Sequence, residues 1–523
     1  MPNIPETLVA MLATTALGAV WSAIPPELGA ESTLKRLEIL RPKAVLAVDG
    51  YVYSGKRVKK ADDLRRVLDA LGFRGPLASL SYLEGHVPGS IPMEDGLSGR
   101  ARPEFAQVPS EHPLWVLFTS GTTGIPKAPV HGHAGITVES HKVGELCSDY
   151  RSSDLVLFFS STGWVAWNRH MAALMAGASV ATYDGNPLYP DPENMWRVME
   201  RTGASYVGVA ASLIIESMRR GLRPGENFDL RKLRTIGVTA APLPAEGFRW
   251  IVNSVREDLW IDSMSGGTEI FGDLIANVPI VPVYAGVTGK RCLGMDVESY
   301  DDAGSPVRDA PGELVIRQPF PSMPLYLMGD RDFALYRSTY FSAFEGVWRH
   351  GDFLVIRSDG YCTVLGRSDA TIKRRGVRLG TGEIYEVVES LPFVADSLAI
   401  GVEDYSGETL FLLFVSTKSG HLDDRMKDEI RRALRERLSP RYTPDAIIEV
   451  SSIPRTLSGK KVEVPVKRIL MGMPPEKAVD VNSLSNQDAF WEIIRAARAF
   501  LEARAQAGRW PANSQEVAAR LNP

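Results

Sequence analysis

The residues from Thr119 to Lys127, Thr-Ser-Gly-Thr-Thr-Gly-Ile-Pro-Lys, have the types and spacing of an anion-binding loop. Glycines let a backbone turn tightly, so that its N–H groups can point at an anion. The serine and threonine hydroxyls add donors, and the lysine adds a positive charge. This pattern predicts a loop that grips nucleotide phosphates through Thr119, Ser120, Gly121, Thr122, Thr123, Gly124 and Lys127.

The loop is not a Walker A motif, which requires G-x-x-x-x-G-K followed by Ser or Thr. Here Gly121 and Gly124 are too close together, and Ala128 follows the lysine. A P-loop kinase or GTPase is therefore disfavoured. Considered alone, the loop is also explained by an ordinary polar turn after the apolar run 114–118, which we expect to be a buried strand.

Two further groups of residues present carboxylates. The sequence Ser-Gly-Gly-Thr-Glu at 265–269 forms a turn whose Thr268 and Glu269 could hold a phosphate and Mg²⁺, because hard cations take oxygen ligands. Asp352 ends the sequence Trp-Arg-His-Gly-Asp. In isolation an ordinary loop or turn is the favoured explanation of each group, since Gly and Asp are common there.

Basic motifs follow in the last third of the chain. They are Gly-Arg-Ser-Asp at 366–369, Gly-Val-Arg-Leu-Gly at 376–380 and Pro-Arg-Thr-Leu-Ser-Gly-Lys at 454–460. Taken singly, each is compatible with a solvated basic loop. Their order after the Gly/Thr loop is more informative, and it closely resembles the adenylate-forming superfamily of acyl-CoA synthetases, luciferases and peptide-synthetase adenylation domains.

The resemblance implies roles for the nucleotide-binding residues. Thr268 would contact the α-phosphate, Glu269 would lie near Mg²⁺, Asp352 would accept from both ribose hydroxyls, and Arg367 would contact ribose or phosphate. The end of the adenine-binding strand would be Ala240, Ala241 and Pro242. Residues 240–241 depart from the usual Gly-Glu-Pro, so we expect only backbone contacts there. His350 stands where Thr is more usual.

The same resemblance implies roles in catalysis and domain movement. Lys460 would be the catalytic lysine that bridges the substrate carboxylate and the α-phosphate, and Arg378 would grip the phosphates during adenylation. Asp369 would be the hinge for rotation of a small domain, and Gly376 would then line the pantetheine tunnel. Arg435 is placed where a basic residue could meet a CoA phosphate, and Lys461 is expected to face solvent.

The acid substrate is predicted from two further positions. Acetyl-CoA synthetases carry a bulky Trp two residues before the Thr of the Thr-Glu motif, whereas this chain has Gly266, which would leave space for a longer acid. One methylene contributes only about 1–3 kcal/mol of discrimination. The segments 162–168 and 318–324 resemble the acetoacetyl-CoA synthetase family. Trp164 would then lie near the acyl site, although core packing explains it equally well.

The implied activity is an ATP-dependent acid–thiol ligase that converts acetoacetate through an acyl-adenylate to acetoacetyl-CoA, with ATP, Mg²⁺ and coenzyme A taking part. Three alternatives remain open: another short-chain acyl-CoA synthetase, an inactive truncated nucleotide-binding homologue, and an adenylating enzyme that serves a carrier protein. Members of the family usually carry a sizeable N-terminal block before the segment that residues 2–21 resemble. The resemblance therefore implies that this chain begins inside that block.

Composition agrees with a cytoplasmic enzyme that has small-molecule partners. A chain of 523 residues is long enough for several cores. The net charge of -4 argues against nucleic-acid binding, and no apolar stretch is long enough to predict a membrane partner. Three separated cysteines indicate neither a disulfide framework nor a metal knuckle. The oligomeric state is left open.

The elements that must position these motifs are predicted from hydrophobic patterning. Short apolar strands alternate with helical segments up to about residue 293, which predicts a parallel α/β core. Strands separated by turns follow from Gly294, which predicts a β-rich subdomain. We expect a large AMP-binding domain over 1–366, a mobile α+β lid domain over 367–475 and a polar tail over 476–523 with one helix at 486–505.

Overall fold

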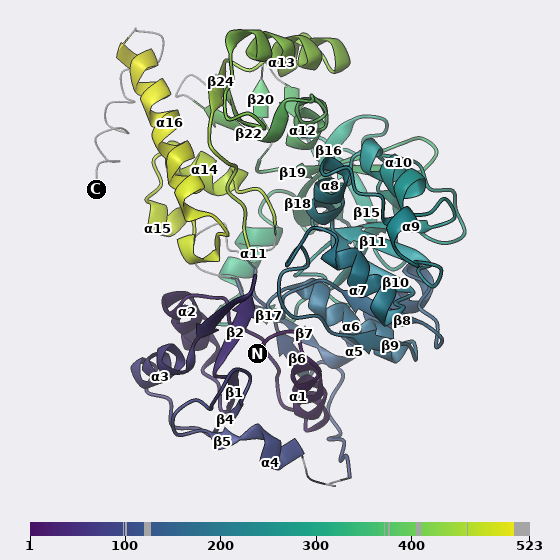
Figure 1. Ribbon diagram of the computed structural model, residues 1–523, viewed down its shortest axis with the longest axis vertical. Helices are drawn as coiled ribbons and strands as arrows, with labels where there is room; N and C mark the ends of the chain where they lie inside the picture. Colours follow the sequence, from purple (N-terminus) through teal and green to yellow (C-terminus); the bar gives the residue numbers. More distant parts are fainter. Residues whose placement is uncertain are drawn as a thin grey trace.

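The computed structural model describes residues 1–97, 99, 102–119, 127–370, 372–374, 377–403, 409–457 and 459–506. Figure 1 shows a large N-terminal part, with a smaller C-terminal part packed against it. The chain therefore has the expected large α/β domain and small α+β domain.

The first hundred residues form a small α/β layer at one end of the large domain (Figure 1). Strands β1, β4 and β5 pair in parallel, and β2 pairs with β3 as a hairpin. The elements are α1 (Pro5–Ala16), α2 (Ala30–Leu40), β1 (Val45–Val48), β2 (Gly50–Tyr53), β3 (Lys56–Lys59), α3 (Ala61–Ala70), β4 (Leu77–Leu80), β5 (Ile91–Pro92) and α4 (Met93–Leu97).

An eleven-stranded sheet with the order β15-β16-β18-β19-β14-β13-β12-β11-β10-β8-β9 dominates the large domain. Its strands are β8 (Leu155–Phe158), β9 (Ser179–Ala181), β10 (Tyr206–Ala210), β11 (Thr235–Thr239), β12 (Trp260–Gly267), β13 (Gly272–Ala276), β14 (Gly289–Arg291), β15 (Val297–Tyr300), β16 (Pro311–Ile316), β18 (Trp348–Ile356) and β19 (Tyr361–Arg367). From β9 to β12 the strands are parallel, and beyond β12 they are antiparallel. The parallel core and the β-rich part are thus one continuous sheet.

Helices cover both faces of the parallel half because their apolar residues recur at helical spacing. One face packs Met195, Trp196 and Met199 of α7 and Ile251 of α10 against the sheet. The other face packs alanines of α6 against Val156, Phe158 and Tyr206. The helices of this part of the chain are α5 (His133–His141), the π-helical η1 (Lys142–Cys147), α6 (Val165–Met175), α7 (Asn194–Thr202), α8 (Ala211–Arg219), α9 (Pro224–Asn227) and α10 (Ala245–Ser254). A later helix, α11 (Ala334–Tyr340), packs against the antiparallel half.

The predicted phosphate loop joins two strands of a separate three-stranded sheet. This sheet has the order β17-β7-β6, with β6 at Pro113–Val116, β7 at Pro129–Gly132 and β17 at Tyr326–Leu327. The backbone of Thr119 bridges that of Lys127, and the Thr119 N–H donates to the Lys127 carbonyl at 3.0 Å. The two ends of the loop are therefore held together, while Ser120 to Pro126 lie outside the described residues.

The small domain is built on a three-stranded sheet in which β22 pairs antiparallel and β24 parallel to β23. Helices on its two faces form two separate cores. The elements are β20 (Ile372–Arg374), β21 (Val377–Leu379), α12 (Thr381–Glu389), β22 (Val394–Glu403), β23 (Thr409–Thr417), α13 (Asp424–Arg437), η2 (Pro440–Tyr442), β24 (Ala446–Glu449), α14 (Glu463–Leu470), α15 (Pro475–Ala478), η3 (Val481–Ser483) and α16 (Gln487–Gln506).

Much of the segment expected to be a polar tail packs into the small domain. Phe490, Ile493 and Ile494 of α16 are buried against Phe414 and other residues of the sheet. The sequence Phe-Trp-Glu-Ile-Ile, with its apolar residues on one helical face, is the signal for this packing. Residues 507–523 lie outside the described part of the chain.

Candidate active site

Lys127, the last residue of the predicted phosphate loop, meets Glu269, which lies two residues after the end of β12. The Lys127 Nζ lies 3.2 Å from the Glu269 Oε1 and 5.0 Å from the centre of the Tyr340 ring. The Tyr340 hydroxyl lies 3.4 Å from the same carboxylate oxygen. The structure therefore brings together a predicted phosphate-binding lysine and the predicted metal-binding carboxylate.

The Glu269 carboxylate is ionised at any physiological pH. Burial alone would raise its pKa, but the positive charge of Lys127, together with His350 and Arg367, lowers the pKa to about 2. The backbone of the residue is also fixed, because the Nε2 of His131 lies 3.0 Å from its carbonyl. Burial lowers the pKa of His131 to about 4, so this imidazole is neutral.

The residues expected at the ribose lie on a hairpin formed by β18 and β19, in which Asp352 pairs with Arg367. The Arg367 Nη1 lies 3.5 Å from the Asp352 Oδ1, and its Nε donates to the Asp369 Oδ1 at 3.3 Å. Gly351 has a φ of 89°, and a Cβ there would come within 2.7 Å of the Arg367 Nη2. A glycine is therefore required for this approach.

His350 lies beside Asp352, at the position where Thr is more usual. Its Nε2 lies 3.5 Å from the Asp352 Oδ2, and 5% of its side chain is exposed. Burial lowers the pKa of His350 more strongly than the neighbouring carboxylates of Asp352 and Glu269 raise it. A neutral imidazole can donate one N–H, as a threonine hydroxyl would.

Lys460 belongs to the small domain and is exposed, and its electrostatic interactions with Arg367, Asp352 and Glu269 indicate that it lies near these residues. The surrounding protein and the charge of Arg367 lower the pKa of Lys460, while Asp352 and Glu269 act in the opposite direction. We call residues 455–457 and 459–461 the lysine turn; Ser458 lies outside the described residues. Within the turn, the Thr456 N–H donates to the Lys460 carbonyl at 2.8 Å.

The expectation that Lys461 faces solvent is wrong. Its ammonium group donates to Glu389 and to the Ser397 carbonyl, and it lies 3.0 Å from the Asp396 Oδ1. It also lies 3.6 Å from the centre of the Tyr385 ring. The backbone of the turn is extended at this point, so successive side chains point to opposite sides. Lys460 consequently faces the site, whereas its neighbour faces the small domain.

The other expected residues are distributed as follows. Thr268 is half-buried directly before Glu269. Ala240 directly follows β11 and has a φ of 74°, a left-handed conformation that is uncommon for a residue with a Cβ. Ala241 and Pro242, the next two residues, are exposed. Gly376 and the side chain of Arg378 lie outside the described part of the chain.

Arg435 is not brought to this group of residues. It is exposed on α13, which lies on the far side of the small domain in Figure 1, and its Nε donates to the Arg431 carbonyl at 3.4 Å. The predicted contact of Arg435 with a CoA phosphate stays a prediction.

The two residues expected at the acyl site are constrained by packing. Trp164 precedes α6 and is partly buried against the cluster that contains Tyr206 and Met264. Gly266 lies at a bulge between β12 and β13, and a Cβ there would come within 1.9 Å of the Gly272 carbonyl oxygen. Close approach of the two backbones is therefore a sufficient reason for this glycine.

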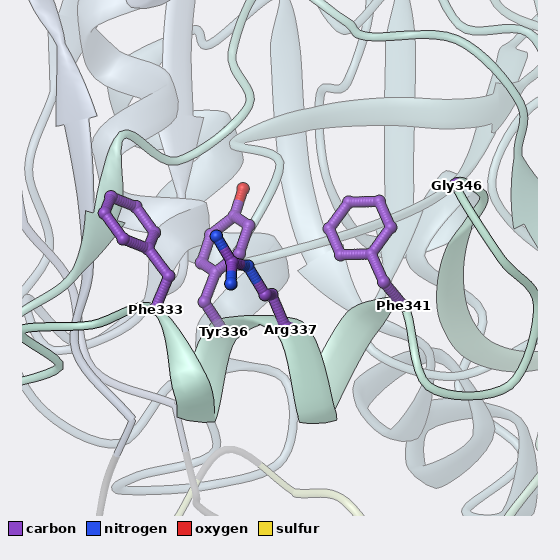
Figure 2. A pocket seen from close by; sticks show the side chains of 5 residues that line it. All are labelled: Phe333, Tyr336, Arg337, Phe341 and Gly346. Carbon is purple, nitrogen blue, oxygen red and sulfur yellow. The ribbon is translucent and has the colours of Figure 1, made fainter.

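Aromatic residues in and beside α11, which sequence reasoning missed, pack next to the Glu269 carboxylate. Tyr340 stacks on Trp348 with ring centres 3.8 Å apart. In Figure 2 the side chains of Phe333, Tyr336 and Phe341 rise from the same side of the chain around α11. With Arg337 and Gly346 they line an open pocket of about 400 Å³. The aromatic repeat at 333–341 was the available sequence signal.

Two features are absent from the part of the chain that the structure describes. Within the described ranges, no set of three His, Cys, Asp or Glu side chains is arranged to hold a metal ion. Nor does any helix among them have the length and apolarity needed to span a membrane.

Family comparison first defines the class of protein. Residues 1–327 match the AMP-binding enzyme family, and residues 383–460 match the C-terminal domain of AMP-binding enzymes. The anthranilate CoA ligase AuaEII, solved in complex with anthranoyl-AMP, has the same fold with a TM-score of 0.75, although the sequences are 20% identical. That structure covers 88% of this chain, and this chain covers 84% of it. The chain therefore has the fold of an adenylate-forming AMP-binding enzyme.

More similar relatives narrow the class. The acetoacetyl-CoA synthetase of Gallus gallus is 36% identical over 507 residues, which span 94% of this chain and 76% of the relative. That of Rhizobium meliloti (strain 1021) is 37% identical over 498 residues, with 94% and 76% covered. The solved structure of acetoacetyl-CoA synthetase from Streptomyces lividans is 40% identical in sequence and has a TM-score of 0.90. The match covers 95% of this chain and 77% of that one. The chain therefore belongs to the acetoacetyl-CoA synthetase family.

Proposed function

We propose that this chain activates acetoacetate with ATP and transfers it to coenzyme A. Acetoacetate and ATP would give acetoacetyl-AMP and pyrophosphate, and the CoA thiol would then displace AMP to give acetoacetyl-CoA. The observation that supports this most directly is the convergence of Lys127, Glu269, Asp352, Arg367 and Lys460 from distant segments of the chain. The family membership supplies the choice of acid.

The charge of the reactants explains why cations are needed. A carboxylate that attacks the α-phosphate of ATP brings two anions together. Lys127, Arg367 and Lys460 offer positive charge that the fold has already positioned, so little reorganisation is required when charge develops in the transition state. Lys460 is the one of these that comes from the small domain, and we infer that it contacts the reacting carboxylate and phosphate.

The residues present fit a Mg²⁺ ion that arrives with ATP. Mg²⁺ is commonly held by one or two carboxylates together with substrate phosphates and water. Glu269 supplies one carboxylate that stays ionised, with a pKa of about 2. The buried Thr119 hydroxyl, which has no hydrogen-bond partner among the described residues, is one further oxygen at the end of the phosphate loop. When bound, the ion would neutralise phosphate charge.

We further infer that the small domain moves between the two steps. Asp369 follows β19 at the junction of the two domains and would be the hinge, as its position in the motif suggests. Rotation there would withdraw Lys460 and bring the segment that contains Gly376 and Arg378 towards the site. The same rotation is the route by which Arg435 would approach CoA.

The test is acid-dependent formation of AMP by the full chain with ATP, Mg²⁺ and CoA. Acetoacetate is compared with acetate, propionate and butyrate, and the thioester is identified by mass. We expect acetoacetate to have the highest kcat/KM. Equal kcat/KM for butyrate and acetoacetate would refute the choice of acid, and no acid-dependent release of pyrophosphate would refute the ligase.

Lys460→Ala tests the assigned lysine. We expect a loss of about 10²–10³-fold in adenylation, the range found when a positioned electrostatic donor is removed. Lys427→Ala, which removes a lysine paired on the surface of α13 with Asp424, is the matched control and should keep normal activity. Full activity of Lys460→Ala would show that another group neutralises the reacting charge.

A further inference from the structure

Arg219 lies in the last turn of α8 in the large domain, and its guanidinium group contacts the small domain. Its Nη2 donates to the Oε2 of Glu389 at 3.0 Å. Glu389 is the last residue of α12, which lies beside α8 in Figure 1. The two side chains are 22% and 15% exposed. The ion pair therefore joins the domains at a place largely shielded from water.

The second oxygen of Glu389 belongs to a network that holds the lysine turn. Its Oε1 accepts from Lys461, which also lies 3.0 Å from the Asp396 Oδ1. The other oxygen of Asp396 accepts from the Arg455 Nη2 at 2.7 Å. Arg455 in turn donates through its Nη1 to the Gly459 carbonyl at 2.9 Å. Four side chains of the small domain, those of Glu389, Lys461, Asp396 and Arg455, thus link Arg219 to the backbone beside Lys460.

The opposite end of α8 meets the lysine turn directly. Ser212 lies in the first turn of this helix, and a Cβ on Gly459 would lie 3.2 Å from its Oγ. Gly459 has a φ of 81°, a conformation that a glycine adopts without strain. The helix therefore contacts the turn near its N-terminus and binds Glu389 at its C-terminus, so that the turn is seated along the helix.

The charges of the network allow this contact to open. Within the small domain, the carboxylates of Glu389 and Asp396 are balanced by the cations of Lys461 and Arg455. If Arg219 withdraws, neither carboxylate loses its last cation, so the penalty of an unpaired buried charge does not arise. Arg219 itself stays at a helix C-terminus, where a cation is favourable.

We propose that Arg219 is a positioning residue for the adenylation step. Its ion pair with Glu389 seats the lysine turn on α8, so that Lys460 faces the nucleotide site. This inference rests on the proposed function, because it assigns the pair to one of the two proposed steps. The pair opens when the small domain turns for thioester formation, while the network behind the lysine turn moves with that domain unchanged.

The test measures adenylation and thioester formation separately in two variants, Arg219→Ala and Arg219→Lys. Adenylation is followed as release of pyrophosphate from ATP and acetoacetate without CoA. Thioester formation is followed as a single turnover after CoA is added to enzyme loaded with the adenylate. Arg220→Ala is the matched control, because Arg220 is the next residue and pairs with Glu216 on the exposed side of α8.

For Arg219→Ala we expect adenylation kcat to fall about tenfold or more, since hydrogen bonds between charged groups are among the stronger ones in proteins. KM for ATP and the rate of thioester formation should stay near their normal values. Arg219→Lys should recover most of the loss, and Arg220→Ala should show none. Equal losses in both steps, no loss in either, or a similar loss in Arg220→Ala would overturn the proposal.

A second measurement keeps this inference separate from the proposed function. If the normal chain does not adenylate acetoacetate, the proposed function fails, and amide hydrogen exchange still tests the positioning role. In the full chain without substrates, the amides of Thr456, Gly459 and Lys460 should exchange faster in Arg219→Ala than in Arg220→Ala. Equal exchange in the two variants would refute the role assigned to Arg219.

Discussion

Replacing Glu269 by Gln is predicted to lower the free energy of unfolding at neutral pH and to make that free energy less dependent on pH. The side chain is enclosed by Lys127, His350 and Arg367, which favour its ionised form. Glutamine has nearly the same shape, but it is neutral like the protonated acid. The substitution therefore isolates the charge of this one carboxylate while keeping the volume of the site.

The pKa shift gives the size of the effect. The pKa of Glu269 falls from the ordinary value of 4.5 to about 2 in the folded protein. A tenfold change in an ionisation constant is worth about 1.4 kcal/mol, so the ionised form contributes about 3 kcal/mol at neutral pH. Because the folded pKa is the lower one, this stabilisation is fully present above pH 4.5 and is lost as the pH falls towards 2.

The assay is unfolding by urea at several pH values without nucleotide. At pH 7 we expect Glu269→Gln to be less stable than the normal chain by about 3 kcal/mol, and we expect this gap to narrow below pH 4.5. Glu257→Gln, a change at an exposed position, is the control and should alter stability by less than about 0.5 kcal/mol. A Glu269→Gln variant as stable as the normal chain at pH 7 would refute the reasoning.

Two further predictions concern stability. Gly266→Ala should destabilise the large domain by about 1–3 kcal/mol or more, since its Cβ would lie 1.9 Å from the Gly272 carbonyl oxygen. Gly85→Ala is the control and should leave the stability unchanged, because no atom of the described residues beyond its chain neighbours lies within 4 Å of the added Cβ. Thermal unfolding compares the two variants, and equal melting temperatures would contradict the explanation by backbone approach. Lys461→Met should lower the free energy of unfolding by about 3–5 kcal/mol, because it breaks a buried network of ion pairs. Lys460→Ala should change the free energy of unfolding by less than about 0.5 kcal/mol. Equal losses of stability in the two variants would show that the network is weak.

The sequence predicted the features that depend on neighbouring residues. Apolar runs such as 206–209 and 235–238 became strands β10 and β11, because short buried strands need continuous hydrophobic residues. Some of the predicted site residues lie beside one another, with Lys127 next to Glu269 and Asp352 next to Arg367, whereas Arg435 lies elsewhere. Their order along the chain carried that prediction, since no local pattern indicates that these segments meet.

Features that depend on distant pairing were missed. Lys461 was expected in solvent because the sequence around it is polar, yet its partners Glu389 and Asp396 lie more than sixty residues earlier. Tyr340 likewise reaches the Glu269 carboxylate from a helix whose local sequence shows only aromatic character. Burial of a charged side chain requires partners, and single-sequence patterns do not identify partners at such separations.

The two glycines at 266–267 have separate physical explanations, and these bear on how the acid is chosen. Gly266 permits the approach of the Gly272 carbonyl, and a Cβ on Gly267 would lie 2.9 Å from the His350 ring. At this point β12 changes from parallel pairing with β11 to antiparallel pairing with β13, through a bulge that redirects the strand towards Thr268 and Glu269. The glycines thus serve the geometry of the nucleotide site. A small residue at 266 does not by itself identify acetoacetate, so substitutions of Trp164, which leave this bulge intact, are the sharper probe of acid selection.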